Sequence, residues 1–131
     1  MKKLLLITTL LALLVGLSSC ESDETVYDRI VGRVWIGNLG FVSDDAYHYP
    51  LESGIYFGSD GFGDDELCYA DGQSYAKLRC QWFVEDGDLY IDYGRVADPR
   101  ELRNVYVGHG SLTGDLFVGG YSYGTVTLHM Q

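Results

Sequence analysis

Side chains that could hold a metal ion are few in this chain of 131 residues. Its histidines are His48, His109 and His129, and no two of them stand four residues apart, the helical spacing of a zinc pair. The sequence contains no Cys-x-x-Cys. We therefore interpret the three histidines as surface residues and expect no metal site and no cofactor.

Two acidic stretches, 60–66 and 85–88, carry side chains that could do chemistry. The first offers oxygen ligands for Ca²⁺ but lacks the spacing of an EF-hand loop. The second could supply a pair of carboxylates for glycoside hydrolysis. Both flank Asp-Gly turns, where Asp accepts local backbone hydrogen bonds, so we expect solvated turns. The sequence also lacks a Gly-x-Ser-x-Gly elbow and a Walker loop, and we expect no enzymatic activity.

Aromatic residues are the other candidates for binding, since the chain holds 11 Tyr, 5 Phe and 2 Trp. Aromatic faces can stack on sugars, so these residues invite a carbohydrate-binding interpretation. We place Tyr90, Tyr106, Tyr121 and Tyr123 on the outer face of a predicted sheet and treat them as candidate ligand-facing residues. The alternative is that these rings pair across strands and stabilise the sheet without any ligand.

Composition limits the class of protein. Hydrophobic residues make up 47% of the chain and charged residues 21%, which indicates a folded protein. The length allows one domain, because two domains would each be too small to bury a good core. The net charge of −10 argues against nucleic acid as a partner.

The pattern from residue 28 onward is that of short strands. Apolar and polar residues alternate in runs separated by Gly and Asp, and no long helical periodicity is present. Short turns between consecutive strands favour an antiparallel up-and-down meander. We predict one helical turn at 27–32 and strands at 33–39, 53–57, 63–70, 75–84, 88–93, 102–107, 111–118 and 121–130.

An eight-stranded meander can close into a small barrel, which removes exposed strand edges. A two-sheet β-sandwich is the alternative architecture. Large inward-facing residues predict a filled interior without a cavity of the ~300 Å³ expected of a drug-sized ligand site. The predicted core consists of Trp35, Phe57, Leu78, Trp82, Leu89, Ile91, Leu116, Val126 and Leu128.

Two cysteines, Cys68 and Cys80, lie in neighbouring predicted strands. Cys80 shares a face with Trp82, whereas Cys68 lies on the face opposite Leu67. This parity predicts two thiols; a bulge or longer turn between them would change the parity and permit a disulfide.

Residues 1–20 have the organisation of an export signal. A basic start precedes an uncharged apolar run, 4–17, which at ~1.5 Å per residue is too short for a ~30 Å bilayer core. The run ends in Leu-Ser-Ser-Cys at 17–20, which resembles the lipobox of bacterial lipoproteins. The resemblance implies cleavage before Cys20 and a diacylglycerol on its thiol. We assign 1–19 to the signal peptide; an ordinary secretory signal is the alternative.

The residues behind the lipobox are acidic, and we interpret 20–27 as a lipidated tether ahead of a β-barrel domain at 28–131. The tether resembles the export tag of surface-exposed lipoproteins of Bacteroidetes-type bacteria. That resemblance implies attachment to the outer membrane and exposure at the cell surface. A plain solvated linker is the alternative. Removal of 1–19 takes away two lysines and no acidic residue, so the net charge becomes −12.

Three turn-forming segments carry a second resemblance: Gly-x-x-Trp at 32–35, Phe-x-x-Asp-Gly at 57–61 and Trp-x-x-x-Asp-Gly-x-Leu at 82–89. Together they resemble small lipocalin-like lipoproteins of gut Bacteroidetes over residues 28–130. The resemblance implies a small lipocalin-like barrel; its motifs specify fold and not chemistry.

These observations lead to one hypothesis and two alternatives. The hypothesis is a lipid-anchored lipoprotein of the cell envelope with a non-enzymatic accessory or binding role, attached through a diacylglycerol on Cys20. A basic protein or a carbohydrate would be its partner. The alternatives are a small-ligand carrier of the lipocalin-like kind and an inhibitor of a cationic exported enzyme such as lysozyme, to which a charge of −12 would steer it.

Overall fold

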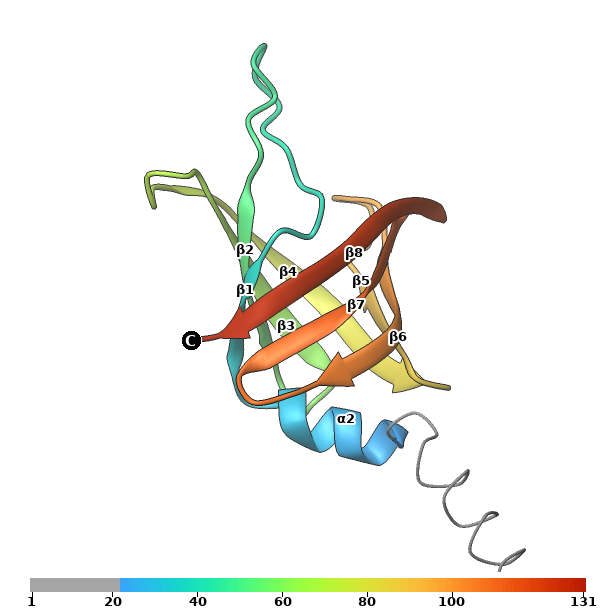
Figure 1. Ribbon diagram of the computed structural model, residues 1–131. Coiled ribbons are helices and arrows are strands. Elements are labelled where there is room, and N and C mark those ends of the chain that lie inside the picture. Colours follow the sequence, from blue (N-terminus) through green and yellow to red (C-terminus); the bar gives the residue numbers. More distant parts are fainter. Residues whose placement is uncertain (1–21) are drawn as a thin grey trace, which may run out of the picture.

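In a computed structural model, which describes residues 22–131, the chain forms a closed antiparallel β-barrel (Figure 1). The predicted signal peptide and Cys20 lie outside the described residues. The strands follow one another around the barrel in chain order, and β8 pairs with β1 to close it. The predicted up-and-down barrel is confirmed. Its strands are β1 (Val34–Gly37), β2 (Glu52–Phe57), β3 (Phe62–Cys68), β4 (Ser74–Glu85), β5 (Asp88–Asp92), β6 (Arg100–Val107), β7 (Ser111–Val118) and β8 (Tyr121–Met130).

The strand bounds match the predicted ones most closely where glycine turns flank the strand. β7 and β8 have the predicted bounds, whereas β1 is shorter than predicted and ends at Gly37. A Cβ atom at Gly37 would lie 2.9 Å from the Thr127 carbonyl oxygen and would overlap the Leu128 side chain. The close approach of β1 to β8 therefore requires glycine at this position.

The lumen is filled by inward-facing side chains. Trp35, Phe57, Leu89, Leu116 and Leu128 are all buried, in agreement with the predicted core. Leu78 and Val126, also predicted there, are only partly buried and pack against the others. Side chains therefore occupy the inward positions where a carrier would hold its ligand.

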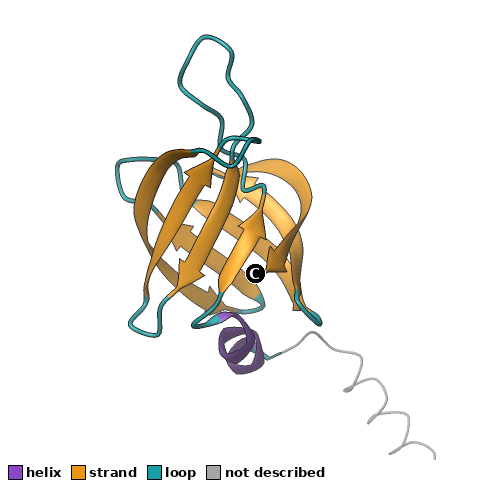
Figure 2. Ribbon diagram, turned by 90° about the vertical axis from the view of Figure 1, so that its left-hand side faces the viewer, coloured by secondary structure: helices purple, strands orange, loops and turns teal. Residues whose placement is uncertain are grey.

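Helix α2 (Asp23–Ile30) covers one end of the barrel (Figure 2). Val26 and Ile30, one helical turn apart, have no exposed surface. The Trp35 indole Nε1 donates a hydrogen bond of 3.1 Å to the Ile30 carbonyl oxygen, and the Tyr27 ring stacks on Trp82 at 5.1 Å. No helix within residues 22–131 is long and apolar enough to cross a membrane.

The helix begins earlier than the sequence predicted, since a single turn was expected at 27–32 and an acidic tether up to residue 27. The Ser22 hydroxyl accepts a hydrogen bond from the Thr25 backbone N–H at 3.2 Å and so caps the helix. The Asp23 carboxylate accepts backbone hydrogen bonds of 2.7 Å from both Asp86 and Gly87 in the β4–β5 turn. These contacts make residues 23–27 part of the packed domain, which begins before the predicted boundary at 28.

The two ends of the barrel differ. The α2 end carries short turns, whereas the opposite end, called the rim below, carries the long β1–β2 connection (38–51) and the β3–β4 turn (69–73) (Figure 1). This connection projects furthest from α2 in both overall views.

Candidate functional site

The four candidate aromatic residues lie on the outer surface but do not meet. Tyr121, Tyr106 and Tyr123 are 82%, 60% and 51% exposed. Tyr106 lines a hollow with Arg29 at the α2 end, whereas Tyr121 and Tyr123 begin β8. Tyr90 stacks on Phe83 of the neighbouring strand, with ring centroids 4.8 Å apart. The structure thus distributes these tyrosines over separate regions, and Tyr90 makes the cross-strand pair that the alternative interpretation describes.

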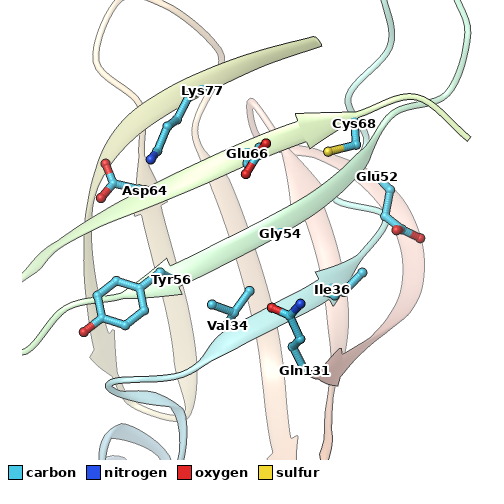
Figure 3. A pocket seen from close by; sticks show the side chains of 10 residues that line it. All are labelled: Val34, Ile36, Glu52, Gly54, Tyr56, Asp64, Glu66, Cys68, Lys77 and Gln131. Carbon is cyan, nitrogen blue, oxygen red and sulfur yellow. The ribbon is translucent and has the colours of Figure 1, made fainter. Parts of the chain in front are cut away.

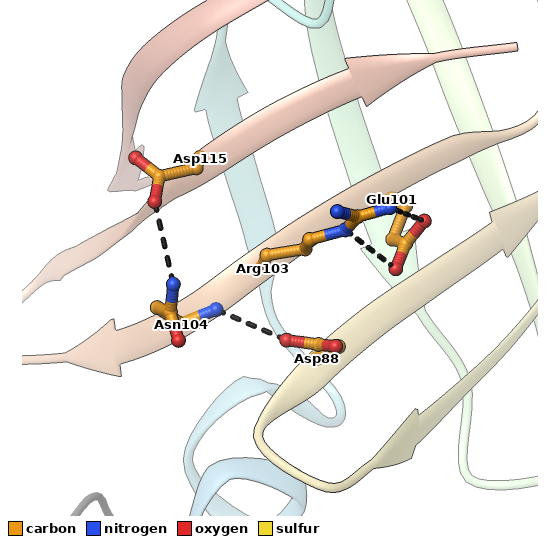
Figure 4. Close-up of polar contacts among 5 residues, drawn as sticks. All are labelled: Asp88, Glu101, Arg103, Asn104 and Asp115. Carbon is orange, nitrogen blue, oxygen red and sulfur yellow. Dashed lines mark hydrogen bonds and ion pairs between the residues drawn. The ribbon is translucent and has the colours of Figure 1, made fainter. Parts of the chain in front are cut away.

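Polar groups on the outer face of β5–β7 are bonded to one another (Figure 4). Arg103 Nε lies 3.0 Å from Glu101 Oε1. The Asn104 backbone N–H donates to Asp88 Oδ1 at 3.0 Å, and its side-chain amide donates to Asp115 Oδ2 at 3.4 Å. Asn104 has a φ of 54° and lies where the β6–β7 register shifts. This network holds a bulge in β6 and has a structural role.

The acidic stretch 60–66 divides between turn, outer surface and lumen. Asp60 accepts from the Phe62 backbone N–H at 3.0 Å, as expected of a turn. Asp64 and Glu66 lie on the outer face of β3, but Asp65 is fully buried, so the expectation of a solvated turn is wrong for Asp65. The turn ends before β3, and strand alternation then directs every second residue inward.

Asp65 belongs to a buried polar cluster that was not predicted from the sequence. Its Oδ2 accepts hydrogen bonds from the Tyr93 hydroxyl at 2.7 Å and the Ser53 hydroxyl at 3.2 Å. Its Oδ1 is buried without a hydrogen-bond partner. Burial raises the pKa of Asp65, and the two hydrogen bonds and the charge of Arg100 oppose that rise. The only signal in the sequence was the alternation of β3.

Arg100 supplies the positive charge of this cluster. Its Nε donates to the Leu39 carbonyl oxygen at 2.8 Å, and its guanidinium lies 3.6 Å from the centre of the Phe41 ring. Burial lowers the pKa of Arg100. Because its members are buried, we interpret this cluster as part of the core and not as a binding site.

The two cysteines are free thiols, as their parity predicted. Cys80 is buried in the lumen opposite Gly63, whereas Cys68 lines a groove on the outer surface. Burial, followed by the charges of Asp65 and Asp64, raises the pKa of Cys80 to about 12. The three histidines are exposed, as predicted.

A groove of about 500 Å³ crosses the outer face of β1–β4 (Figure 3). Its apolar part consists of Val34, Ile36 and Gly54, and three carboxylates and Lys77 surround it. We call it the outer groove; it is lined by Val34, Ile36, Glu52, Gly54, Tyr56, Asp64, Glu66, Cys68, Lys77 and Gln131.

Gly54 lines the outer groove between Val34 and Glu66. A Cβ atom there would lie 3.8 Å from the Glu66 carbonyl oxygen and 4.0 Å from Val34 Cγ1, which are ordinary contacts. Packing therefore does not require glycine at this position. The groove combines an apolar floor with acidic walls, an arrangement suited to the alkyl stem and cationic end of a lysine side chain.

A second hollow, of about 550 Å³, lies at the rim between the β1–β2 connection and the β3–β4 turn. Two tyrosine rings and two aspartates are among its walls. We call it the rim pocket; it is lined by Asp45, Tyr49, Pro50, Tyr69, Ala70, Asp71 and Gln73. None of these residues was predicted as a site residue, because the β2–β3 hairpin separates the two segments in the chain.

Comparisons of the chain with protein-family models, with curated proteins and with solved structures give no significant match. Within residues 22–131, no group of three or more His, Cys, Asp or Glu side chains is arranged to hold a metal ion. The surface hollows and their chemistry are therefore the basis for a functional proposal.

Proposed function

We propose that this chain is a lipid-anchored, non-enzymatic binding protein of the cell envelope, held at the outer membrane with the barrel exposed at the cell surface. The observation that supports binding at the outer surface is the filled lumen. Trp35, Leu89 and Leu116 are buried inside it, and α2 covers one end. A ligand-carrying role inside the barrel finds no support in this packing, so a partner would contact the outer surface.

The proposed anchor and the fold agree in geometry. Cys20 precedes Ser22 by two residues, so a lipid on Cys20 would attach the barrel by its α2 end. The rim would then face away from the membrane (Figure 2). The net charge of −12 that remains after signal removal is repelled by anionic headgroups, so the lipid and not a basic patch would provide attachment.

The anchor is tested with a Cys20→Ser variant in a bacterial host that processes lipoproteins. Wild-type protein should incorporate radiolabelled fatty acid and sediment with outer-membrane fragments, and protease added to intact cells should digest it. The variant should lose the label and the sedimentation together. Continued labelling of the variant would contradict the assignment of Cys20.

The outer groove favours a second candidate function, inhibition of a cationic exported enzyme such as lysozyme. Glu52, Asp64 and Glu66 line one groove and would attract a basic surface. Added protein should slow lysozyme, and the effect should weaken with salt because screening shortens the reach of surface charges.

The matched variants for this candidate remove two charges each. Glu52→Gln/Glu66→Gln should abolish inhibition, whereas Glu24→Gln/Asp28→Asn, on the exposed face of α2, should retain it. Equal inhibition by both double variants would exclude the outer groove.

A further inference from the structure

The rim pocket is preformed by hydrogen bonds within the β1–β2 connection. The Ser43 backbone N–H donates to the Tyr49 carbonyl oxygen at 2.8 Å, and the Tyr49 N–H donates to the buried Ser43 hydroxyl at 2.8 Å. His48, at a φ of 48°, is held by its N–H, which donates to the Asp45 carbonyl oxygen at 3.2 Å. A non-glycine residue persists in this backbone region only where its surroundings fix it. The loop therefore presents Tyr49 in a defined place.

The two tyrosine walls of the rim pocket are each supported by a second ring. Tyr47 stacks on Tyr49 with centroids 5.5 Å apart, and Tyr75 meets Tyr69 edge to face at 5.5 Å. The Tyr75 hydroxyl donates to Asp44 Oδ1 at 2.6 Å and so ties the β1–β2 connection to β4. The side chain of Tyr49 nevertheless remains 49% exposed, which leaves it open to a partner.

The charge at the rim pocket is negative. Asp45 and Asp71 line it, and the residues that line it include no Lys or Arg. Asp44 lies beside them, bonded to Tyr75. Partial burial and then the charges of Asp45, Asp44 and Asp71 raise the pKa of Tyr69. The pocket thus combines aromatic faces with unneutralised carboxylates.

The geometry points to a docking site: the rim pocket receives an arginine side chain from a basic protein partner, and this rests on the proposed binding function. A guanidinium is planar and always charged, it stacks on aromatic faces, and its fork of N–H donors suits carboxylates. Tyr49 and Tyr69 supply the faces, and Asp45 and Asp71 supply the acceptors. Charge complementarity selects a basic protein over a neutral sugar, which would need no carboxylate pair.

The test is an NMR titration of the full ¹⁵N-labelled chain in a neutral detergent. The probes are the peptide acetyl-Gly-Arg-Gly-Arg-Gly-amide and its lysine and citrulline counterparts, since citrulline keeps the shape of arginine without its charge. The arginine peptide should bind most tightly, the lysine peptide more weakly and the citrulline peptide least. Chemical-shift changes should gather at 45–50 and 69–73.

Two substitutions locate the site. Asp45→Asn/Asp71→Asn removes two charges but keeps the side-chain oxygens that accept from Tyr47 and Gln73 backbone N–H groups. It should weaken binding about tenfold or more. The control Asp60→Asn/Asp92→Asn makes the same change at two other exposed turn aspartates, which accept from Phe62 and Gly94, and should bind as the wild type does.

A pair of tyrosine variants separates the aromatic contribution. Tyr49→Ala should weaken binding about fivefold through loss of one cation–π contact. Tyr121→Ala, which removes an even more exposed ring in β8, should have no effect. Each variant must keep the dispersed spectrum of the wild type, and the two rim variants support the proposal independently of one another.

Four results would overturn the proposal. Three of them are equal binding of the arginine and citrulline peptides, shift changes centred on the outer groove, and equal loss in the rim and control double variants. Arginine amide binding as tightly as the peptide would overturn protein docking in favour of a small-molecule site. None of these results bears on lipid attachment, which the Cys20→Ser labelling decides separately.

Discussion

The hydroxyl of Tyr93, the residue directly after β5, donates a hydrogen bond of 2.7 Å inside the barrel to Asp65 Oδ2 on β3, which does not pair with β5. Both residues are buried, and the second carboxylate oxygen of Asp65 has no hydrogen-bond partner. Burying a charge costs free energy unless its partners compensate fully. The link between β3 and the end of β5 is therefore sensitive to the protonation of Asp65.

We predict that Asp65 makes the barrel less stable as the pH rises. Burial raises its folded-state pKa above the ordinary value of 3.8, so the folded state binds the proton more tightly than the unfolded state does. The contribution of Asp65 is therefore most favourable below the unfolded pKa and is lost as the pH rises through the folded pKa. As the pH rises through the folded pKa, the free energy of unfolding of Asp65→Asn should increase relative to that of the wild type. Urea denaturation across a pH series measures the difference, and Asp60→Asn, at an exposed turn, should show no such trend.

The Tyr93 hydroxyl should matter most when Asp65 is charged. Tyr93→Phe removes one of two hydrogen bonds to Asp65 Oδ2 and should cost ~1–3 kcal/mol at pH values above the folded-state pKa of Asp65. The loss should shrink at acid pH, because a protonated carboxyl group is neutral and accepts a weaker hydrogen bond than a carboxylate does. A loss that stays constant across the pH series would contradict the coupling between the two residues.

How far the sequence predicts this structure depends on the range of the interactions. β7 and β8 are defined by local alternation and by glycine turns, and their bounds were predicted from these signals. The burial of Asp65 depends on Ser53 and Tyr93, which lie 12 and 28 residues away. Strand alternation directs Asp65 inward, but no local pattern indicates that it meets Ser53 on β2 and Tyr93 after β5.

The first residues of α2 and the rim pocket were not predicted, for the same reason. Val26 and Ile30 are too few apolar residues to indicate a helix until the barrel end provides a surface for them. The rim pocket needs contact between Asp44 and Tyr75, which lie 31 residues apart. The lipobox lies outside the described residues, and the resemblance to lipoproteins of Bacteroidetes concerns the origin of the protein. The fold tests neither.

Trp82 should be a major source of stability. Its side chain is 4% exposed, its Nε1 donates to the Gly58 carbonyl oxygen at 2.9 Å, and its ring packs between Tyr27 and Phe57. Trp82→Ala should cost ~3–5 kcal/mol of unfolding free energy, measured from the denaturant midpoint and slope. A cost below ~1 kcal/mol would show that the ring is not buried.

Asp23 should hold α2 against the β4–β5 turn. Its carboxylate accepts two backbone hydrogen bonds of 2.7 Å, from Asp86 and Gly87. Asp23→Ala should cost ~1–3 kcal/mol and should speed hydrogen exchange of those two amides. Asp28→Ala, on the exposed side of the same helix, is the control and should leave both amides protected. Unchanged exchange in the Asp23 variant would place α2 away from the turn.

Two strand glycines should respond oppositely to alanine. At Gly37 the added methyl group would overlap Leu128 and approach the Thr127 carbonyl oxygen at 2.9 Å, so Gly37→Ala should cost ~1–3 kcal/mol. At Gly54 it meets only ordinary contacts, and Gly54→Ala should be neutral or stabilising by ~0.5–1 kcal/mol. Paired thermal denaturation measures both changes. Equal losses at the two sites would contradict the close approach of β1 to β8.

The two thiols of the barrel should differ in reactivity because they lie on opposite faces of the wall. Cys68 is partly exposed in the outer groove, whereas Cys80 is buried and its pKa is raised to about 12. Maleimide reacts with the thiolate, so the folded protein should be labelled at Cys68 and should be labelled at Cys80 only after denaturation. Peptide mass mapping after timed labelling measures both rates, and Cys68→Ser should abolish labelling of the folded barrel. A peptide pair joined by a Cys68–Cys80 disulfide, or equal labelling of both cysteines without denaturant, would contradict the parity of β3 and β4 in this structure.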